Sequence, residues 1–194
     1  MRYKVGITGG IGSGKSIVGQ ILSTMGYPVF YSDAVAKQLM TENKQAREEV
    51  TRVFGDEAYT DKELNRPFLA KQIFEDESLK SKLSEIIHPK VRANFDAFFD
   101  AHDAPLVFNE AAILFETYAY KNFDYTLLVV ADESIRIERV MKRDQVSKQE
   151  VLKRMENQWS DEKKINLADF VIENNAEKLV VPQVLSFIDK LSTA

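Results

Sequence analysis

The hydrophobic positions of this chain form short continuous runs separated by longer amphipathic segments. The runs have the length of strands buried on both faces, and the segments between them have helical spacing. The expected strands are residues 3–8, 29–31, 105–110, 125–130 and 170–172. Strands that alternate with helices are typical of a parallel sheet joined by crossover helices. The pattern predicts a five-stranded, mostly parallel α/β core.

After the second strand a long stretch of the chain shows only helical patterns. From about residue 34 to 104 no convincing strand is visible, which predicts a helical insertion between the second and third strands. Pro67 and Pro89 are expected just inside helix starts, where the missing N–H costs little. The expected helices are residues 17–22, 35–40, 45–54, 66–74, 79–87, 91–99, 136–144, 148–159 and 181–191.

A glycine-rich motif follows the first expected strand and leads into the first helix. Residues 9–16 read Gly-Gly-Ile-Gly-Ser-Gly-Lys-Ser and match the phosphate-binding pattern G-x-x-x-x-G-K-[ST] at every fixed position. Glycines let the backbone curl so that successive N–H groups surround phosphate, and the helix adds its positive end. A plain glycine turn is disfavoured by the strand–loop–helix context. The residues expected to bind a nucleoside triphosphate are Ile11, Gly12, Ser13, Gly14, Lys15 and Ser16.

Two residues of this loop have side chains suited to the triphosphate itself. Lys15 is expected to reach the β- and γ-phosphates, and the Ser16 hydroxyl is expected to bind Mg²⁺.

Acidic residues follow the expected strands, at the edge where parallel α/β sheets bind ligands. Asp33 follows the second strand and is expected to be a functional acid; it also suits the N-cap of the next helix, and the two roles can coexist. Glu110 ends the third strand and is a candidate to support Mg²⁺ or its water shell, with Glu116 as a second candidate. We interpret Asp132 and Glu133 after the fourth strand as a helix start.

Basic residues gather on one expected helix. Arg136, Arg139 and Arg143 are spaced so that they share a helix face, which is either a solvated basic surface or part of a lid. A lid arginine stabilises charge on a transferring phosphoryl group. We expect this role for at least one of them, with Arg143 the first candidate.

Two further polar residues have alternative interpretations. Asn174 follows the fifth strand and either contacts the base edge of a nucleotide or serves as a turn residue. His88 lies in the segment of the insertion with the most side chains able to contact anions and hydroxyl groups. A surface or cap histidine is equally consistent with its position.

Composition narrows the class of protein. The 194 residues carry a net charge of −4, which argues against a nucleic-acid backbone as the main partner. There is no cysteine, so disulfides and thiolate sites are excluded. The first strand begins too early to leave room for a signal peptide, and no run reaches the ~18 apolar residues of a membrane span. We expect a cytoplasmic protein without membrane contact, either a monomer or a small homo-oligomer.

The loop alone is shared by kinases, switches and motors. A GTP switch normally carries Asn-Lys-x-Asp, but the segment at Asn43-Lys44 lacks the acid. A motor would need larger coupling domains than this length allows. A small-molecule kinase fits best, because transfer needs an acceptor and ATP held together and shielded from water. We expect a nucleotide-binding core at 1–34, 105–134 and 165–194, a helical acceptor-binding insertion at 35–104 and a lid at 135–164.

The sequence also resembles the dephospho-CoA kinase family over nearly its whole length. The loop motif is common to many NTPases, but the combination of segments is specific. The matching segments are residues 6–16, Ser32-Asp33-Ala34, Leu64-Asn65-Arg66, His88-Pro89, Ala112-Ile113-Leu114-Phe115-Glu116, Arg139 through Arg143-Asp144, Gln158, and Ala168-Asp169-Phe170-Val171-Ile172-Glu173-Asn174. The resemblance implies transfer of the ATP γ-phosphate to the 3′-hydroxyl of the ribose in dephospho-CoA, the last step of coenzyme A synthesis.

The resemblance also implies roles for individual residues. It makes Asp33 the candidate general base or orienting acceptor for the hydroxyl. The acceptor-binding residues that it implies are Arg66, His88 and Glu116. The lid residues are Arg139 and Arg143, and the residue that contacts adenine is Asn174.

The chain departs from the family pattern near the acceptor side. Asn65 stands where aspartate is frequent, and Ala112 where proline is common. Two alternatives stay open: a kinase of the same architecture for another nucleoside or nucleotide, and a nucleotide-dependent switch without phosphoryl transfer.

Overall fold

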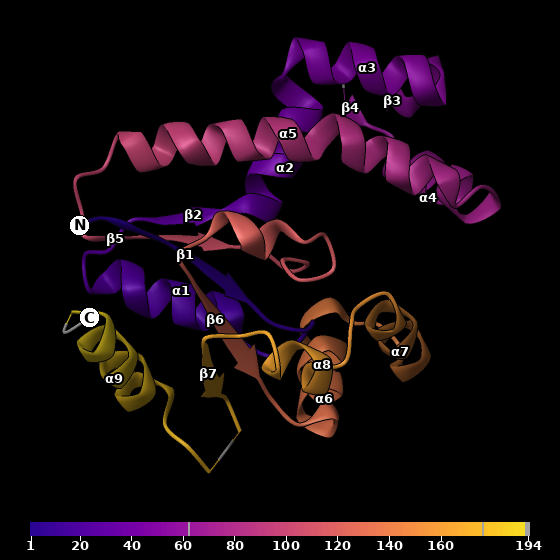
Figure 1. Cartoon of the computed structure of the whole chain (residues 1–194). Helices are drawn as coiled ribbons and strands as arrows, with labels where there is room; N and C mark the ends of the chain where they lie inside the picture. Colours follow the sequence, from indigo (N-terminus) through magenta and orange to yellow (C-terminus); the bar gives the residue numbers. More distant parts are fainter. Residues whose placement is uncertain (62, 176, 193–194) are drawn as a thin grey trace. The chain divides into compact units, whose positions relative to one another are not determined.

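The computed structural model describes residues 1–61, 63–175 and 177–192 (Figure 1). The chain divides into two compact units. Unit 1 comprises Met1–Phe30 and His102–Ala194, and unit 2 comprises Tyr31–Ala101. Unit 2 covers nearly the same residues as the expected insertion. Residues 135–164, expected as a lid, belong to unit 1.

Unit 1 is built on a sheet that confirms the expected α/β core. Within the described residues the sheet has five strands in the order β2-β5-β1-β6-β7, and β1 pairs in parallel with both β5 and β6. β6 in turn pairs in parallel with β7. The strands are β1 (Tyr3–Thr8), β2 (Val29–Tyr31), whose last residue is assigned to unit 2, β5 (Leu106–Glu110), β6 (Tyr125–Val130) and β7 (Phe170–Glu173).

The register of the central strands places the ends of β1 and β5 side by side. Ile7 of β1 lies opposite Glu110 of β5 and opposite Leu127 of β6. Because parallel strands end at the same edge of a sheet, Glu110 comes level with the residues that lead into the glycine-rich loop.

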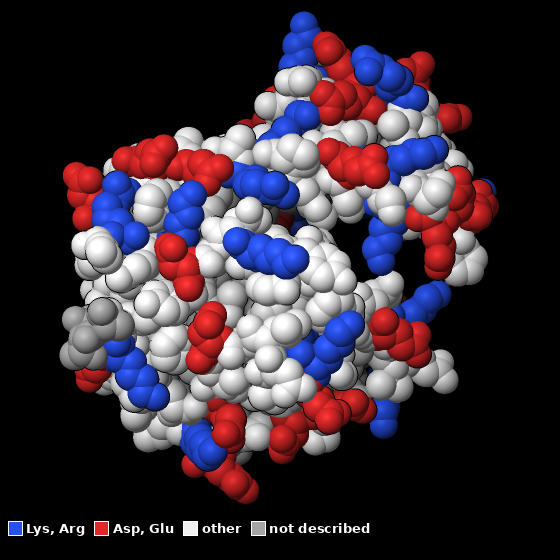
Figure 2. All heavy atoms as spheres, viewed as in Figure 1, with Lys and Arg blue, Asp and Glu red and all other residues white. Residues whose placement is uncertain are grey.

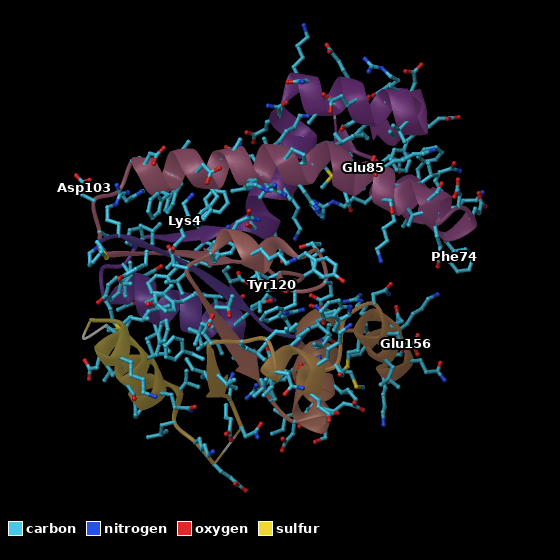
Figure 3. All side chains as sticks on the ribbon, viewed as in Figure 1. Lys4, Phe74, Glu85, Asp103, Tyr120 and Glu156 are labelled. Carbon is cyan, nitrogen blue, oxygen red and sulfur yellow. The ribbon has the colours of Figure 1, made fainter. Side chains whose placement is uncertain are left out.

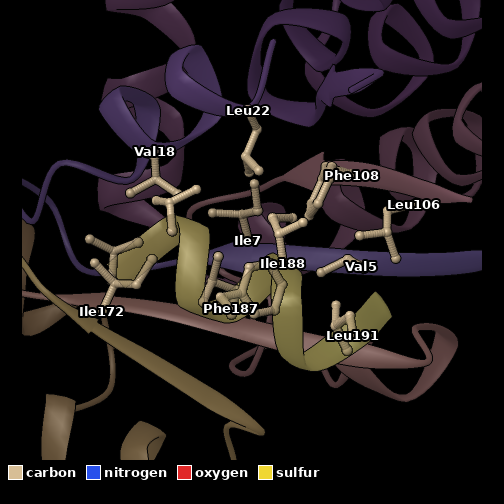
Figure 4. Close-up of a cluster of buried hydrophobic side chains, with 13 residues drawn as sticks. Val5, Ile7, Val18, Leu22, Leu106, Phe108, Ile172, Phe187, Ile188 and Leu191 are labelled. Atoms are coloured by element: carbon tan, nitrogen blue, oxygen red, sulfur yellow. The ribbon is translucent and has the colours of Figure 1, made fainter. Parts of the chain in front are cut away.

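Helices α1 (Lys15–Thr24) and α9 (Val180–Ser192) pack on one face of this sheet, as Figure 4 shows. Val18 and Leu22 from α1 meet Phe187 and Ile188 from α9 over the strand residues, among them Phe108. Burial of these large apolar side chains stabilises the arrangement of strand, loop and helix.

The remaining helices of unit 1 follow β6: α6 (Glu133–Asp144), α7 (Lys148–Glu156) and the short α8 (Asp161–Ile165). The expected helix over 148–159 ends three residues early, and α8 was not predicted. Ser147 begins α7 with a capping box that includes Glu150, and Ser160 caps α8 by accepting the Lys163 N–H at 3.3 Å. The second cap, 13 residues after the first, separates the two helices and leaves residues 157–160 as a loop.

Unit 2 is mainly helical, with α2 (Ser32–Glu42), α3 (Lys44–Phe54), α4 (Arg66–Glu75) and α5 (Ser78–Asp100). It also holds an antiparallel pair of two-residue strands, β3 (Tyr59–Thr60) and β4 (Glu63–Leu64), where no strand was expected. Such a short pair has no periodicity to detect.

Helix α5 is continuous where two helices were predicted, because Pro89 lies inside it instead of near a start. Ile87 and Phe95, eight residues apart on one face, are both buried, and this packing on both sides of the proline outweighs the one lost N–H.

The core of unit 2 forms around Val50, Phe54 and Leu69. Lys90 of α5 reaches Glu49 of α3 with an N–O distance of 2.7 Å, which ties these two helices together at the edge of the core. At the end of α4, Phe74 projects outward and is 76% exposed (Figure 3).

Charged side chains of both signs are interspersed over each unit on the face shown in Figure 2. No extended area of one sign is seen among the described residues of that face. In the part of the chain that the structure describes, no helix has the length and apolar content needed to cross a membrane.

Candidate active site

The glycine-rich loop lies between β1 and α1 and takes a shape that requires two of its glycines. Gly12 and Gly14 have φ angles of 80° and 93°, a left-handed conformation that L side chains rarely adopt. A Cβ atom on Gly14 would lie 2.0 Å from Nδ2 of Asn174. These two positions therefore need glycine for both conformation and space.

The carbonyl oxygens on one side of the loop are bound by side chains of unit 1. Arg136 Nε donates to the Ile11 carbonyl at 3.0 Å, Arg139 Nη1 approaches the Gly12 carbonyl at 3.4 Å, and Asn174 Nδ2 donates to the Ser13 carbonyl at 2.8 Å. The C=O and N–H of a trans peptide group point in opposite directions. Contacts to the Ile11 and Ser13 carbonyls therefore turn the N–H groups of the next residues, Gly12 and Gly14, away from these side chains.

The loop N–H groups do not all face the same side, which differs from the expected run of successive donors. The Ser13 N–H donates to the Gly10 carbonyl at 3.0 Å, and the Ile11 N–H donates to Gln158 Oε1 at 2.8 Å. Lys15 and Ser16 are the first residues of α1, where N–H groups lack intrahelical partners. The loop donors that remain available for a ligand are thus the N–H groups of Gly12, Gly14, Lys15 and Ser16.

Arg136 belongs to the predicted basic stripe but holds the loop instead of facing solvent. It is 8% exposed, and its Nη1 forms an ion pair with Asp161 at 2.8 Å. A Cβ atom on Gly10 would lie 2.2 Å from Arg136 Nη2, which explains a second glycine before Ile11. The spacing of the arginines predicted that Arg136 shares a helix face with the other two. It could not predict that this face lies against the loop.

Lys15 and Glu110 meet beside the loop, as the register of β1 and β5 requires. Lys15 Nζ lies 3.6 Å from Glu110 Oε1, and the two side chains are 16% and 7% exposed. Ser16 is exposed on the next residue of α1. Among the described residues no group of three or more His, Asp or Glu side chains could hold a metal ion. A site with one carboxylate and one hydroxyl fits Mg²⁺, which usually keeps water and takes further oxygens from nucleotide phosphates.

Arg139 and Asn174, predicted for the lid and for adenine, contact each other and the loop. Arg139 Nη2 donates to the Asn174 carbonyl at 3.0 Å, and the Asn174 backbone N–H donates to Val130 at 2.8 Å. Asn174 is 8% exposed. Both residues therefore support the loop in this structure, and their roles toward nucleotide stay predictions.

Arg143 points to an acidic neighbour. Its Nε and Nη2 donate to the two carboxylate oxygens of Asp144 at 2.7 and 3.0 Å, and Arg154 Nη1 also reaches Asp144 at 2.7 Å. These hydrogen bonds hold the pKa of Asp144 at about 2 and raise the pKa of Arg143. The contact of Arg154 with Asp144 was not predicted. The catalytic role of Arg143 stays a prediction, and it requires the guanidinium to exchange Asp144 for phosphate.

Glu116 is engaged inside unit 1. Its Oε1 accepts the Trp159 N–H at 3.0 Å and lies 3.0 Å from Nζ of Lys164, whose side chain is fully buried. This buried ion pair was not predicted, because a run of charged residues such as 161–164 does not indicate which of its members is buried. The predicted contact of Glu116 with the acceptor finds no support in these contacts and remains untested.

In unit 2, Asp33 lies in the first turn of α2 and is exposed. The helix begins one residue before it, and the N-cap position belongs to Tyr31. The alternative interpretation of Asp33 as an N-cap is therefore wrong, because the helix starts earlier than the sequence suggested. An acid in the first turn still interacts favourably with the helix dipole.

Arg66 is the exposed first residue of α4, directly after the cap residue Asn65. The Asn65 side chain accepts the Phe68 N–H at 3.2 Å and donates to the Glu57 carbonyl at 3.0 Å. Aspartate would cap the helix equally well but could not donate to Glu57. This second hydrogen bond accounts for asparagine at this departure from the family pattern.

His88 is half-buried in α5. Burial, followed by the positive charge of Arg92 one turn later, lowers the pKa of His88 below its ordinary value. The imidazole is therefore neutral at pH 7, so it would contact an acceptor as a hydrogen-bonding group and not as a cation.

Comparison with known proteins identifies the family. The family model described as "Dephospho-CoA kinase" matches residues 3–179. The chain belongs to the dephospho-CoA kinase family. A dephospho-CoA kinase of Bacteroides fragilis is 37% identical over 97% of this chain and 92% of its own length, and one of Salinibacter ruber is 43% identical over 88% of each chain.

Solved structures agree with the fold. A crystal structure from Thermus thermophilus is 36% identical, with a TM-score of 0.86 over 99% of this chain and 97% of that chain. A dephospho-CoA kinase from Campylobacter jejuni has a TM-score of 0.69 at 24% identity, over 100% of this chain and 98% of that chain. The latter supports the fold alone. The chain is thus an ATP-dependent kinase of this family with a P-loop core.

Proposed function

We propose that this protein transfers the γ-phosphoryl group of ATP to the 3′-hydroxyl of dephospho-CoA and releases ADP and coenzyme A. Family membership supports the reaction, and the shape of the glycine-rich loop is the observation in the structure that carries it. Carbonyl contacts from Arg136 and Asn174 direct the N–H groups of Gly12 and Gly14 toward one side, where the start of α1 adds its positive end.

The residues of unit 1 supply the nucleotide half of the reaction. The loop N–H groups hold phosphate oxygens, and Lys15 neutralises charge that develops on the transferring group. Glu110 keeps the Lys15 ammonium beside the loop. Ser16 and Glu110 would hold Mg²⁺, which would offset the negative charge of the phosphate groups.

The residues of unit 2 supply the acceptor half in this proposal. Asp33 accepts a hydrogen bond from the ribose hydroxyl and orients it, or takes its proton. Arg66 pairs with acidic groups of the acceptor, and neutral His88 donates or accepts a hydrogen bond. Arg143 of unit 1 leaves Asp144 and stabilises the transferring phosphoryl group.

An ADP-release assay tests the reaction directly. Purified protein, ATP and Mg²⁺ are combined with dephospho-CoA, adenosine, AMP or no acceptor. We expect strong stimulation by dephospho-CoA alone, with coenzyme A as the product. Stimulation by adenosine or AMP instead would indicate a related kinase with another acceptor. Nucleotide binding without stimulation by any of them would contradict the proposal and favour a switch.

The remaining expectations belong to the same proposal. A cytoplasmic location, a monomer or small homo-oligomer and the absence of nucleic-acid binding stay predictions. The mixed charges of the face in Figure 2 support the last of these.

A further inference from the structure

The loop between α7 and α8 contacts the phosphate loop at the backbone N–H of Ile11. This connecting loop, residues 157–160, follows Glu156, which is labelled in Figure 3. Gln158 Oε1 accepts the Ile11 N–H at 2.8 Å across 147 positions of sequence. The Ile11 carbonyl is held by Arg136, which is anchored in turn by Asp161 at the start of α8.

The Gln158 side chain is used at both ends. Its Nε2 donates to the Ala112 carbonyl at 3.3 Å, two residues after Glu110 at the end of β5. The amide thus bridges the phosphate loop and the segment that follows β5. An amide oxygen must face a donor and an amide nitrogen an acceptor, so glutamine meets both requirements in one orientation. Glutamate would keep the acceptor and lose the donor, and methionine would keep the shape and lose both.

The contact from Gln158 completes the fixation of two successive peptide groups. In the Gly10–Ile11 peptide, the carbonyl accepts the Ser13 N–H at 3.0 Å and the N–H donates to Gln158. In the Ile11–Gly12 peptide, the carbonyl is bound by Arg136, so the Gly12 N–H points the opposite way. Without Gln158, the first peptide is held at one end only and can rotate.

We propose that Gln158 is a positioning residue for nucleotide binding. It keeps the Ile11 N–H out of the phosphate site and fixes the loop in the shape that presents the N–H groups of Gly12 and Gly14 to the β-phosphate. The inference rests on the proposed function, since it takes ATP as the bound nucleotide, but it concerns nucleotide affinity and not the acceptor.

The test compares Gln158→Met with a matched control, Gln149→Met, which makes the same change at an exposed position of α7. Calorimetric titration with ADP and competition by AMP distinguish binding of the β-phosphate from binding of the rest of the nucleotide. Only ADP carries the β-phosphate that the loop would hold. We expect Gln158→Met to bind ADP about tenfold more weakly, from one lost hydrogen bond and a less ordered loop. AMP affinity and the properties of Gln149→Met stay unchanged.

A conservative variant and a comparison of the changes in KM and kcat provide further readouts. Gln158→Glu retains an acceptor for Ile11, so ADP binding falls by only about threefold. In turnover, Gln158→Met raises KM for ATP about tenfold and lowers kcat less than threefold, because Lys15 still stabilises the transferring group. Emission from Trp159, the single tryptophan of the chain and the neighbour of Gln158, reports whether the loop stays folded.

Unchanged ADP affinity in Gln158→Met would overturn the proposal, as would an equal loss of ADP and AMP binding with altered Trp159 emission, which indicates general unfolding. The wild-type protein separates this inference from the proposed function. If it binds ADP but does not phosphorylate dephospho-CoA, the proposed reaction fails while the Gln158 comparison still decides the inference. If it binds no nucleotide, both are wrong.

Discussion

The phosphate loop of unit 1 takes its partners from distant parts of the sequence, whereas the candidate residue Arg66 of unit 2 begins a helix that is capped by its neighbour in sequence. Arg136 reaches Ile11 across 125 positions, and Asn174 reaches Ser13 across 161. In unit 2, Asn65 caps α4 through Phe68, 3 positions away. A loop held by remote side chains depends on the whole of unit 1. Exposed residues on helices, such as Asp33, can change with little effect on the fold.

This difference suggests how function is divided between the two units. Binding of a triphosphate by backbone groups needs a rigid loop, because N–H groups that rotate lose their common direction. Contacts made by exposed side chains need only a stable helix beneath them. Substitutions of the residues that hold the loop should therefore affect both stability and nucleotide binding. Asp33→Asn should leave both nearly unchanged, and His88→Gln should alter only the pH dependence of stability.

The largest effect is expected for Lys15→Ala. Removal of the ammonium leaves the transferring phosphoryl charge uncompensated, so kcat should fall by about 10³ in the ADP-release assay. Lys148→Ala, at an exposed position that begins α7, serves as the control and should keep its activity. Near-normal turnover in Lys15→Ala would contradict the assignment of the loop.

Lys164→Met tests whether unit 1 depends on its buried ion pair. The substitution leaves the Glu116 carboxylate buried without its partner, and should cost about 3 kcal/mol and lower Tm by about 10 °C. The double variant Lys164→Met/Glu116→Leu removes both charges and should recover most of this loss. Thermal unfolding followed by circular dichroism measures both. Equal stability of Lys164→Met and the wild type would mean that the pair contributes nothing.

Asp33→Asn tests the opposite behaviour in unit 2. We expect kcat to fall by about 10² through loss of the base or orienting acceptor, while ATP affinity and Tm stay nearly constant. Glu133→Gln removes an exposed acid from the first turn of α6 and controls for the helix dipole. If Asp33→Asn and Glu133→Gln both change only Tm, Asp33 has a structural role and no catalytic one.

The smallest effect is a pH dependence of stability from His88. Its folded pKa lies below its unfolded value, so between the two the unfolded chain binds more protons and stability falls as pH decreases below about 6.5. We expect His88→Gln to lose part of this decline in Tm between pH 7.5 and 5. His102→Gln, at the second histidine of the chain, should retain it. Identical profiles for wild type and His88→Gln would show that burial does not shift this imidazole.

Prediction from sequence succeeded where a pattern is local. Each strand, the glycine-rich loop and the first helix could be predicted from the residues of its own short segment. The structure has them at nearly the predicted bounds. The failures have causes that the local hydrophobic pattern does not reveal. Continuity of α5 through Pro89 depends on burial of Ile87 and Phe95, and the break after α7 depends on a cap at Ser160.

The candidate site shows the same division. Lys15, Ser16 and Glu110 were predicted because they follow a motif or end a strand, and the structure brings Lys15 and Glu110 together. Gln158 was noted only as a match to the family, and Arg154 was not noted at all. Neither residue belongs to a motif that predicts its partner. Gln158 contacts Ile11, and Arg154 contacts Asp144, only in the folded chain.

The amino-acid sequence by itself determined the family, the order of strands and helices, and the loop whose glycines allow phosphate to approach its backbone. The tertiary structure alone decided which loop N–H groups are bound by other residues and which remain available for a phosphate. Each peptide group can turn either way until a side chain binds its carbonyl or its N–H. Those side chains, Arg136, Asn174 and Gln158, reach the loop only when β6, β7 and the loop after α7 have packed around β1.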